Sequence, residues 1–278
     1  YQALLLSPCH QPGAGAGAEH GRPGLSCGDC HTMHGRQPAM QLRPEYEAAT
    51  VCGQCHEPST LSDASASGGH GRHGEVVGCE GCHSPRITYG LLEGMMSHRI
   101  TRPRPQALLG RHDQPDACTQ CHVDQSRRWA ADALAAWQRG EELPVSSAPE
   151  AGPSQVVLDL LGGDPIQRAL AAHALARPTT PVEPRVRMSW LVDALEDDYP
   201  AVRWFGLRGL RAIAQTEGAS PAVDELLSSP DVMDDPGLRA ELVRQLRERL
   251  GPAPLAPDPE RRRVLTERRD DRAIWIGE

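Results

Sequence analysis

Four short segments share one pattern of cysteine and histidine. In each, two cysteines stand three positions apart and a histidine follows the second at once: Cys27-Gly-Asp-Cys30-His31, Cys52-Gly-Gln-Cys55-His56, Cys79-Glu-Gly-Cys82-His83 and Cys118-Thr-Gln-Cys121-His122. This CxxCH pattern attaches haem c, because the two thiols reach the vinyl groups of one porphyrin and the histidine supplies an axial nitrogen to the iron. Zinc sites and redox CxxC pairs need no histidine at that position, so neither explains four repetitions.

The composition of the chain changes near residue 140. Residues 1–140 contain all nine cysteines and eleven of the twelve histidines, and their hydrophobic periodicity is poor. Such a segment cannot bury enough apolar surface to fold around its own side chains. We therefore predict a loop-rich multihaem cytochrome c domain over residues 1–140, whose core is made by four covalently attached haems.

A different pattern follows the Pro- and Ser-rich residues 141–154, which read as a linker. From 155 to about 250, Ala, Leu and Arg recur at helical spacing. A Pro-x-x-Arg frame occurs three times, 35 and 36 residues apart, with an aspartate just upstream that suits a helix N-cap. A leucine follows each arginine by seven residues. The aspartates are Asp164, Asp198 and Asp235; the frames begin at Pro165, Pro200 and Pro236; the leucines are Leu175, Leu210 and Leu246.

A period of this size, made of helices, predicts an α-solenoid. The frame resembles HEAT repeats over residues 155–250, and a plain helical bundle is the alternative. Residues 251–278 are Pro-rich and then charged, and we expect a charged C-terminal tail that docks on the solenoid through Ile274-Trp275-Ile276. The predicted fold class is thus mainly α: a haem-cored domain followed by a HEAT-like solenoid.

Histidines outside the motifs are the candidates for the second axial ligand of each iron. We assign His31, His56, His83 and His122 as proximal ligands, which leaves eight histidines. His173 lies in a predicted helix and reads as structural. The surplus favours bis-histidine, low-spin irons over methionine ligation by Met33, Met40, Met95 or Met96. The distal candidates are then His10, His20, His34, His70, His73, His98 and His112.

Residues 25–137 resemble the haem segment of exported multihaem c-type cytochromes with doubled CxxCH motifs, in which a helical repeat array often follows the haems. The matching stretches are Cys27-Gly-Asp-Cys30-His31-Thr-Met-His34, His70-Gly-Arg-His73, Cys82-His83-Ser-Pro-Arg-Ile-Thr-Tyr89, Ser97-His98-Arg-Ile-Thr-Arg-Pro-Arg-Pro105, and Ala117-Cys118-Thr-Gln-Cys121-His122 with Trp129-Ala-Ala-Asp-Ala behind it. The resemblance implies that His34, His98 and one of His70 and His73 are distal ligands. For the fourth it leaves His20 and His10 as contenders.

Cys9-His10 is a haem motif that lacks its first cysteine. Two interpretations stay open. Either Cys9 holds a fifth haem through a single thioether with His10 as its proximal ligand, or Cys9 is a free thiol beside a distal histidine. In the separate stretch Arg102-Pro-Arg104-Pro, the arginines either neutralise haem propionates or lie on an exposed loop.

Charge and hydropathy narrow the location and the partners. The net charge of −8 argues against a nucleic-acid partner. No apolar run approaches the roughly 20 residues of a membrane-spanning helix. The run Ala3–Leu6 is too short for the core of a signal peptide, so we expect an export signal to have been removed already. Haem attachment through CxxCH takes place outside the cytoplasm, which predicts a periplasmic or extracellular, cell-surface protein.

Closely spaced six-coordinate haems form a path for electrons, so the sequence predicts an electron carrier rather than an enzyme. The repeats would serve docking of redox protein partners or assembly. Two alternatives stand beside this prediction. One is a subunit of a cytochrome filament or of a membrane-bound redox complex. The other is a multihaem reductase, which needs one iron with an open position.

Overall fold

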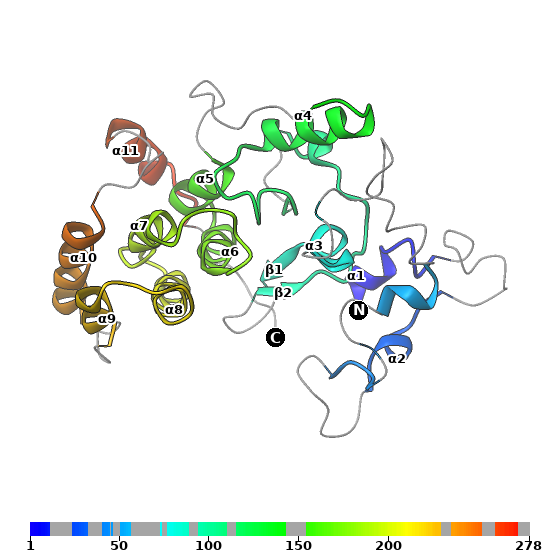
Figure 1. The fold of residues 1–278 in the computed structure, drawn as a ribbon, viewed down its shortest axis with the longest axis horizontal. Coiled ribbons are helices and arrows are strands. Elements are labelled where there is room, and N and C mark those ends of the chain that lie inside the picture. The colour runs from blue at the N-terminus through cyan, green and yellow to red at the C-terminus, as the bar shows by residue number, and fades with distance from the viewer. Residues whose placement is uncertain are drawn as a thin grey trace.

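The computed structural model describes residues 1–11, 24–32, 41–44, 46, 51–56, 73, 77–88, 94–109, 115–142, 154–228, 235–251 and 259–271. Within these residues the chain is mainly helical, as the sequence predicts, and it contains a single two-stranded sheet that the sequence analysis did not predict. The short elements that carry the motifs lie at one end, and the helices from residue 155 onward lie at the other (Figure 1). No helix in the described ranges is both long and apolar enough to span a membrane.

The first part of the chain forms short elements only. They are α1 (Gln2–Leu5), α2 (Cys27–Cys30), the 3₁₀ turn η3 (Val51–Gln54), α3 (Cys79–His83), β1 (Arg86–Thr88), β2 (Gly94–Met96) and the 3₁₀ turn η6 (Pro105–Leu108). The strands pair antiparallel, with Arg86 opposite Met96 and Thr88 opposite Gly94. This hairpin lies between α3 and α6 (Figure 1). A longer helix, α4 (Arg127–Gln138), follows the fourth motif, and its N-cap Ser126 accepts a hydrogen bond from the Trp129 N–H.

The second part forms an array of helices, each of which contacts the next one or two. Thus α6 packs against α5, α7 and α8, and α10 packs against α7 and α9. From α6 onward every helix has proline in its first turn, where the missing N–H costs no hydrogen bond. The helices are α5 (Gln155–Gly162), α6 (Pro165–Ala176), α7 (Pro184–Ala194), α8 (Pro200–Glu217), α9 (Pro221–Leu227), α10 (Pro236–Leu250) and α11 (Pro259–Glu267).

Two of the three predicted aspartate caps form. Asp164 caps α6 in a capping box with Gln167, and Asp235 caps α10. The prediction for Asp198 is wrong, because α8 has Tyr199 as its N-cap and no side-chain cap bond. Asp197 accepts a hydrogen bond from the Tyr199 N–H at 2.9 Å instead, and the same carboxylate pairs with the buried Arg168. The aspartate one position earlier therefore joins two helices rather than capping one.

The hydrophobic core belongs almost entirely to the helical array. Leu175, Leu210 and Leu246, which share one place in the repeated frame, are each 0% exposed. Val123, just after the fourth motif, joins the same core. Among the described residues before Ala117, Leu4 is the one hydrophobic side chain, proline aside, that is fully buried.

The chain beyond the predicted solenoid packs back onto it. In α11, Leu265 contacts the core, and Arg262 pairs with Asp193 of α7. Just after α11, the Arg269 Nε donates to the Leu161 carbonyl at 3.2 Å. Docking is thus made by residues 259–271, whereas Ile274-Trp275-Ile276 lies outside the described residues.

Candidate haem-binding site

Each CxxCH motif folds into one helical turn. The backbone N–H of the motif histidine donates to the carbonyl of the first cysteine in three of them: His31 to Cys27 at 2.9 Å, His56 to Cys52 at 3.1 Å and His122 to Cys118 at 2.8 Å. The third motif is the helix α3 itself. Residues three apart lie on the same face of a helical turn, so both cysteines of a motif face the same side.

Local sequence stabilises these turns. Ser26 and Asp29 form a capping box at α2, with the Ser26 N–H donating to Asp29 at 2.7 Å. The buried Asp116 stabilises the turn of the fourth motif, because its carboxylate accepts from the N–H groups of Cys118 and Thr119. The turns are therefore built by their own residues before any cofactor is considered.

Two histidines have one ring nitrogen occupied by a backbone carbonyl. Nδ1 of His83 lies 2.9 Å from the Thr101 oxygen, and Nδ1 of His10 lies 2.7 Å from the Leu25 oxygen. A carbonyl oxygen can only accept, so Nδ1 must carry the proton in both rings. Nε2 is then the lone-pair nitrogen, as in metal-bound histidines whose other nitrogen is hydrogen-bonded to the protein.

Two pairs of imidazoles from distant parts of the chain lie close together, with ring planes tilted by 45° and 53°. The ring centres of His31 and His98 are 6.0 Å apart, and those of His73 and His122 are 5.9 Å apart. A metal–imidazole bond is about 2 Å long and the ring centre lies about 1 Å behind the nitrogen, so two imidazoles on opposite sides of one metal ion have centres about 6 Å apart. Both pairs therefore have the separation that axial ligation of one iron requires.

Burial and the neighbouring imidazole disfavour the protonated form of one ring in each pair. Burial lowers the pKa of His98, and the neighbouring His31 lowers it further. The pKa of His122 is lowered in the same way, first by burial and then by His73. Neutral imidazole is the form that binds iron.

Helix α4 forms a wall beside the second pair. Trp129 stacks at 4.9 Å from His122, and Trp137, two turns later on the same helix, meets His73 edge-on at 6.5 Å. The Trp129 stretch noted in the sequence thus packs against the histidine of the fourth motif.

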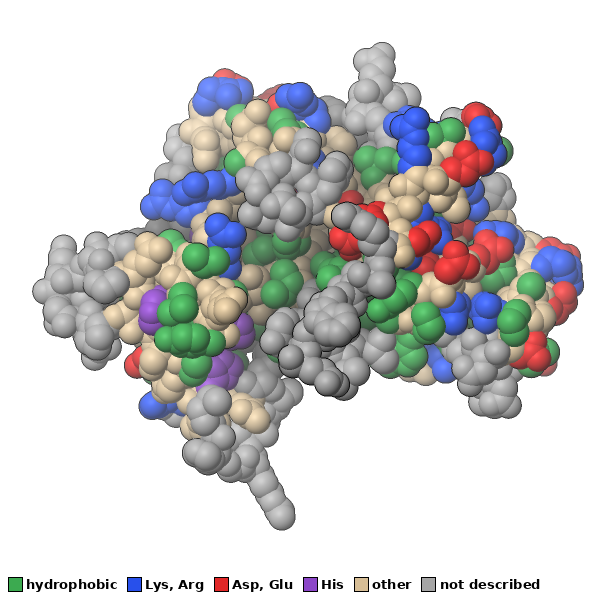
Figure 2. Space-filling view, turned by 180° about the vertical axis from the view of Figure 1, so that it is seen from behind, with side chains coloured by type: hydrophobic (Ala, Val, Ile, Leu, Met, Phe, Trp, Pro, Cys, Tyr) green, Lys and Arg blue, Asp and Glu red, His purple; other side chains and the backbone are tan. Residues whose placement is uncertain are grey.

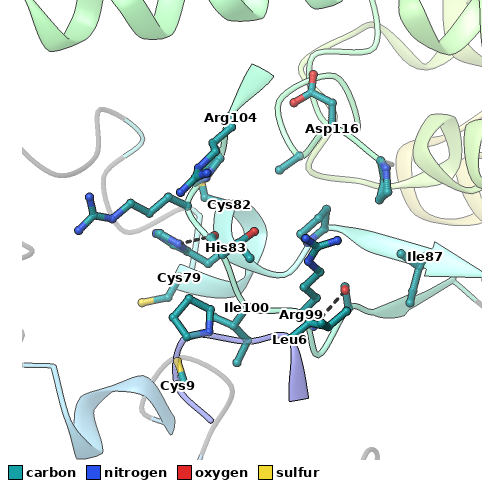
Figure 3. A pocket seen from close by; sticks show the side chains of 18 of the residues that line it. Leu6, Cys9, Cys79, Cys82, His83, Ile87, Arg99, Ile100, Arg104 and Asp116 are labelled. Carbon is teal, nitrogen blue, oxygen red and sulfur yellow. Dashed lines mark hydrogen bonds between the residues drawn. The ribbon is translucent and has the colours of Figure 1, made fainter. Parts of the chain in front are cut away.

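A cavity of about 890 Å³ joins the second and third motifs. Its volume lies at the upper end of the roughly 300–1,000 Å³ typical of ligand pockets. Figure 3 shows His83, Cys79 and Cys82 along one side, Cys9 below them, and the side chains of Leu6 and Ile100 nearby. The lining also includes Cys52, His56, Ile87, Ala107, Leu108, Arg99, Arg102 and Arg104. Apolar walls with thiols, imidazoles and arginines match a haem, whose propionates are carboxylates.

Four of the eight motif cysteines are poor thiolates, because burial raises their pKa. Burial, followed by the adjoining Cys79, raises the pKa of Cys52 to about 12. The pKa values of Cys30, Cys82 and Cys118 are raised too, with burial as the largest cause in each. Zinc requires deprotonated sulfur, whereas a thioether carries no charge and loses nothing on burial. The sites thus fit covalent haem better than zinc, and no group of three or more Cys, His, Asp or Glu in the described ranges is arranged to hold a metal ion.

The N-terminal segment is packed into this region. The Leu25 N–H donates to the Cys9 carbonyl at 3.1 Å, and Ser7 Oγ donates to the Ile100 carbonyl at 3.3 Å. Gly24 lies against the His10 backbone so closely that a Cβ would be 1.6 Å from the His10 oxygen. Cys9 and His10 are therefore held beside the first motif, and Cys9 lines the cavity.

The remaining predicted ligands lie outside the described residues. These are His20, His34, His70 and His112, together with the alternative ligands Met33 and Met40. The other two alternative ligands, Met95 and Met96, belong to β2, and Met95 is exposed. Figure 2 shows histidines gathered at one end of one face, and arginines and carboxylates interspersed over the other end.

Sequence reasoning missed the residues that join the fourth motif to its neighbours. The Gln120 side chain, inside the motif, accepts from the Arg86 N–H and donates to the Arg86 carbonyl, both at 2.7 Å. From α6, Arg177 Nη1 lies 3.4 Å from Cys121 Sγ. The variable positions of a CxxCH motif carry no pattern that would predict such bonds.

Comparison with known families supports the chemistry of the site. The family described as the doubled CXXCH motif matches residues 20–60, which include the first two motifs. Searches of curated proteins and of solved structures find no match. The CXXCH motifs indicate covalent haem c binding and a c-type cytochrome, a class of protein that transfers electrons.

Proposed function

We propose that this protein is an exported electron carrier with four haems c, one on each CxxCH motif. Cys27 and Cys30, Cys52 and Cys55, Cys79 and Cys82, and Cys118 and Cys121 would form the thioethers, with His31, His56, His83 and His122 as proximal ligands. When bound, haem iron supplies reversible one-electron chemistry. The polypeptide holds the macrocycles in place, fills the axial positions and excludes water.

The observation that carries this proposal is that two pairs of imidazoles have the separation that one iron between them would need. We assign His98 as the distal partner of His31, and His73 as that of His122, from ring separations of 6.0 and 5.9 Å. Two histidines on one iron leave no position for a substrate, which favours transfer of electrons over catalysis. His73 is then the distal ligand supplied by the pair before the third motif, and His70 stays a candidate for another iron.

The distal ligands opposite His56 and His83 come from the other histidines near the motifs. His10 is the described candidate, because its Nδ1 is occupied by Leu25 and its Nε2 carries the lone pair. His20, His34 and His70 complete the candidates. With His10 as a distal ligand, Cys9 stays a free thiol and the chain carries four haems rather than five.

The helices from α5 to α10 form a HEAT-like array in this proposal. Their repeated frame buries an equivalent leucine three times, and each helix contacts the next one or two. Arrays of this kind present extended surfaces to other proteins. We propose that this array docks a redox partner or a further copy of the chain, in the periplasm or at the cell surface.

The first test is the number and state of the haems in the purified protein. Intact mass and the pyridine haemochrome assay should give four haems, and a fifth would assign Cys9-His10 as a single-thioether site. Visible spectra, oxidised and reduced, with and without carbon monoxide, should show low-spin haem that does not bind carbon monoxide. A protein without haem would overturn the proposal. A high-spin haem that binds carbon monoxide would favour the reductase.

Substitution tests the ligand pairs one at a time. His98→Ala and His73→Ala should each open one iron, which then becomes high-spin and binds carbon monoxide. The matched control is His173→Gln, which removes a histidine of α6 that packs against Phe205 instead. If His98→Ala gives the same spectrum as this control, His98 is not an axial ligand.

A further inference from the structure

The backbone of Arg177, just after the end of α6, is fixed by hydrogen bonds. Its N–H donates to the Ala174 carbonyl, and its own carbonyl accepts from the Thr180 N–H at 3.1 Å and from Arg187 Nη1 at 3.0 Å. The Arg187 side chain is 0% exposed and also binds the Leu175 and Val182 carbonyls. The backbone at Arg177 is therefore fixed by the core of the helical array, and only its side chain extends out of the array.

The extended side chain reaches the fourth motif. Arg177 Nη1 lies 3.4 Å from Cys121 Sγ, although the two residues are 56 positions apart in the sequence. The surfaces around this contact also meet, since β2 packs against α6: a Cβ on Gly94 would lie 2.8 Å from His173 Cδ2. The array thus touches the motif through a charged group, at the sulfur that would join the porphyrin.

A second arginine approaches the same motif from the hairpin. Arg86 is anchored through its backbone to Gln120, and its Nη1 donates to the Gly94 carbonyl at 2.9 Å. Arg86 and Arg177 are close enough that the pKa of Arg86 is lowered by Arg177, after the larger effect of burial. No carboxylate in the described ranges forms an ion pair with either guanidinium. Glu80 acts on the pKa of Arg86 in the opposite direction, as the smallest of the three effects.

We propose that Arg177 sets the reduction potential of the haem attached through Cys118 and Cys121, with Arg86 as a second contributor. This inference rests on the proposed function. A fixed positive charge beside the macrocycle stabilises the reduced iron over the oxidised iron, since reduction adds an electron. The fourth haem is then held at a higher potential than it would have without the array, and the array acts as part of the redox site.

The contact with Cys121 determines which edge of the proposed haem the Arg177 guanidinium would lie beside. Cys121 attaches at a vinyl group, so Arg177 lies at the thioether edge and not beside the propionates of that haem. Its effect is therefore electrostatic and follows the charge. Lysine at this position should preserve much of the effect, whereas glutamine, of similar polarity, should remove it.

The test is a spectroelectrochemical titration of the holoprotein and three variants. Arg177→Gln should lower the midpoint potential of one haem component and leave the others in place. Arg177→Lys should stay close to the unsubstituted protein. The matched control Arg244→Gln removes an arginine of α10 that pairs with Glu241 in the array, and should shift no component. Potentials in Arg177→Gln that equal those of Arg244→Gln would overturn the inference.

Two further measurements separate the ways in which this test can fail. Arg86→Gln leaves the Gln120 bonds to the Arg86 backbone intact, so it should lower the same component even if Arg177→Gln does not fold. No shift in a folded Arg86→Gln with four haems would count against the charge effect. The pyridine haemochrome assay completes the design: absent haem refutes the proposed function, whereas full haem with unchanged potentials refutes this inference alone.

Discussion

The two parts of this chain differ in how much of their core is made by their own side chains. The helices between residues 154 and 271 bury their own leucines, valines and alanines, together with Trp190 and Phe205. In the described residues before Ala117, only Leu4 of the hydrophobic side chains other than proline is fully buried, and a cavity of about 890 Å³ lies among the motifs. One part is folded by its own side chains, and in the other the proposed haems would occupy the space among the motifs.

Arginine marks the same difference. In the array, Arg168 and Arg187 are fully buried and bind carboxylates and backbone carbonyls, so that they act as crosslinks between helices. Around the cavity, Arg99, Arg102 and Arg104 line the space beside the thiols. Arginine side chains thus join helices in one part and line the candidate cofactor site in the other.

Removal of haem should have the largest effect, and should affect the two parts unequally. We expect the chain made without haem attachment to lose ordered structure over residues 1–142, because nothing replaces the macrocycles as a core. Residues 154–271 should remain helical. Limited trypsin digestion with mass spectrometry should find protected fragments from the array only, whereas the holoprotein should be protected in both parts. Equal cleavage of both parts would show that they share one core.

The buried ion pair of the array gives the next largest effect. Asp197 and Arg168 are each 1% exposed and lie 2.7 Å apart. Asp197→Asn leaves the guanidinium buried without its main counter-charge, which typically costs about 3–5 kcal/mol of the free energy of unfolding. Chemical denaturation followed by circular dichroism measures it.

The matched control uses the other carboxylate on the same arginine. Asp271 pairs with Arg168 at 3.1 Å from a position that is 54% exposed. Because exposed pairs contribute about 0–1 kcal/mol, Asp271→Asn should change the free energy of unfolding far less. Equal losses in the two variants would mean that burial of Asp197 does not determine the strength of the pair.

The array and the site differ in how far sequence alone predicts them. Local spacing predicts the haem motifs, the helical start at 155 and the repeated frame that contains Leu175, Leu210 and Leu246, because helical period and proline position are properties of neighbouring residues. It does not predict the start of α8, where Asp197 rather than Asp198 binds the backbone and also pairs with Arg168. It also leaves open which imidazole faces which. The His31–His98 and Arg177–Cys121 contacts join residues that lie far apart in sequence, and only the packing of hairpin, N-terminal segment and array brings them together.

A cavity in the array should destabilise it and leave the haem spectrum unchanged. Leu210 is fully buried in α8, and Leu210→Ala should cost about 2–5 kcal/mol of the free energy of unfolding. The control Leu238→Ala changes a leucine that is 52% exposed, and it should have little effect. If Leu210→Ala also converted a low-spin haem to high-spin, the two parts would be coupled more tightly than their separate cores imply.

The junction between the two parts should respond to pH through His173. Burial, followed by Arg86, Arg177 and Arg208, lowers the pKa of His173 to about 4. The unfolded chain, with a histidine pKa near 6.5, binds the proton more readily, so stability falls as the pH drops from about 6.5 to about 4 and this contribution is constant below that. The loss amounts to at most about 3.5 kcal/mol at about 1.4 kcal/mol per pKa unit.

His173→Gln isolates this effect from the titration of carboxylates. The variant loses the edge contact with Phe205 at every pH, which lowers its stability by a constant amount. Its stability should then fall less steeply than that of the unsubstituted chain between pH 6.5 and 4. The difference between the two curves, measured by urea denaturation at each pH, reports His173 alone. Parallel curves would mean that the junction opens to water, because a solvated His173 would keep its ordinary pKa despite the three arginines.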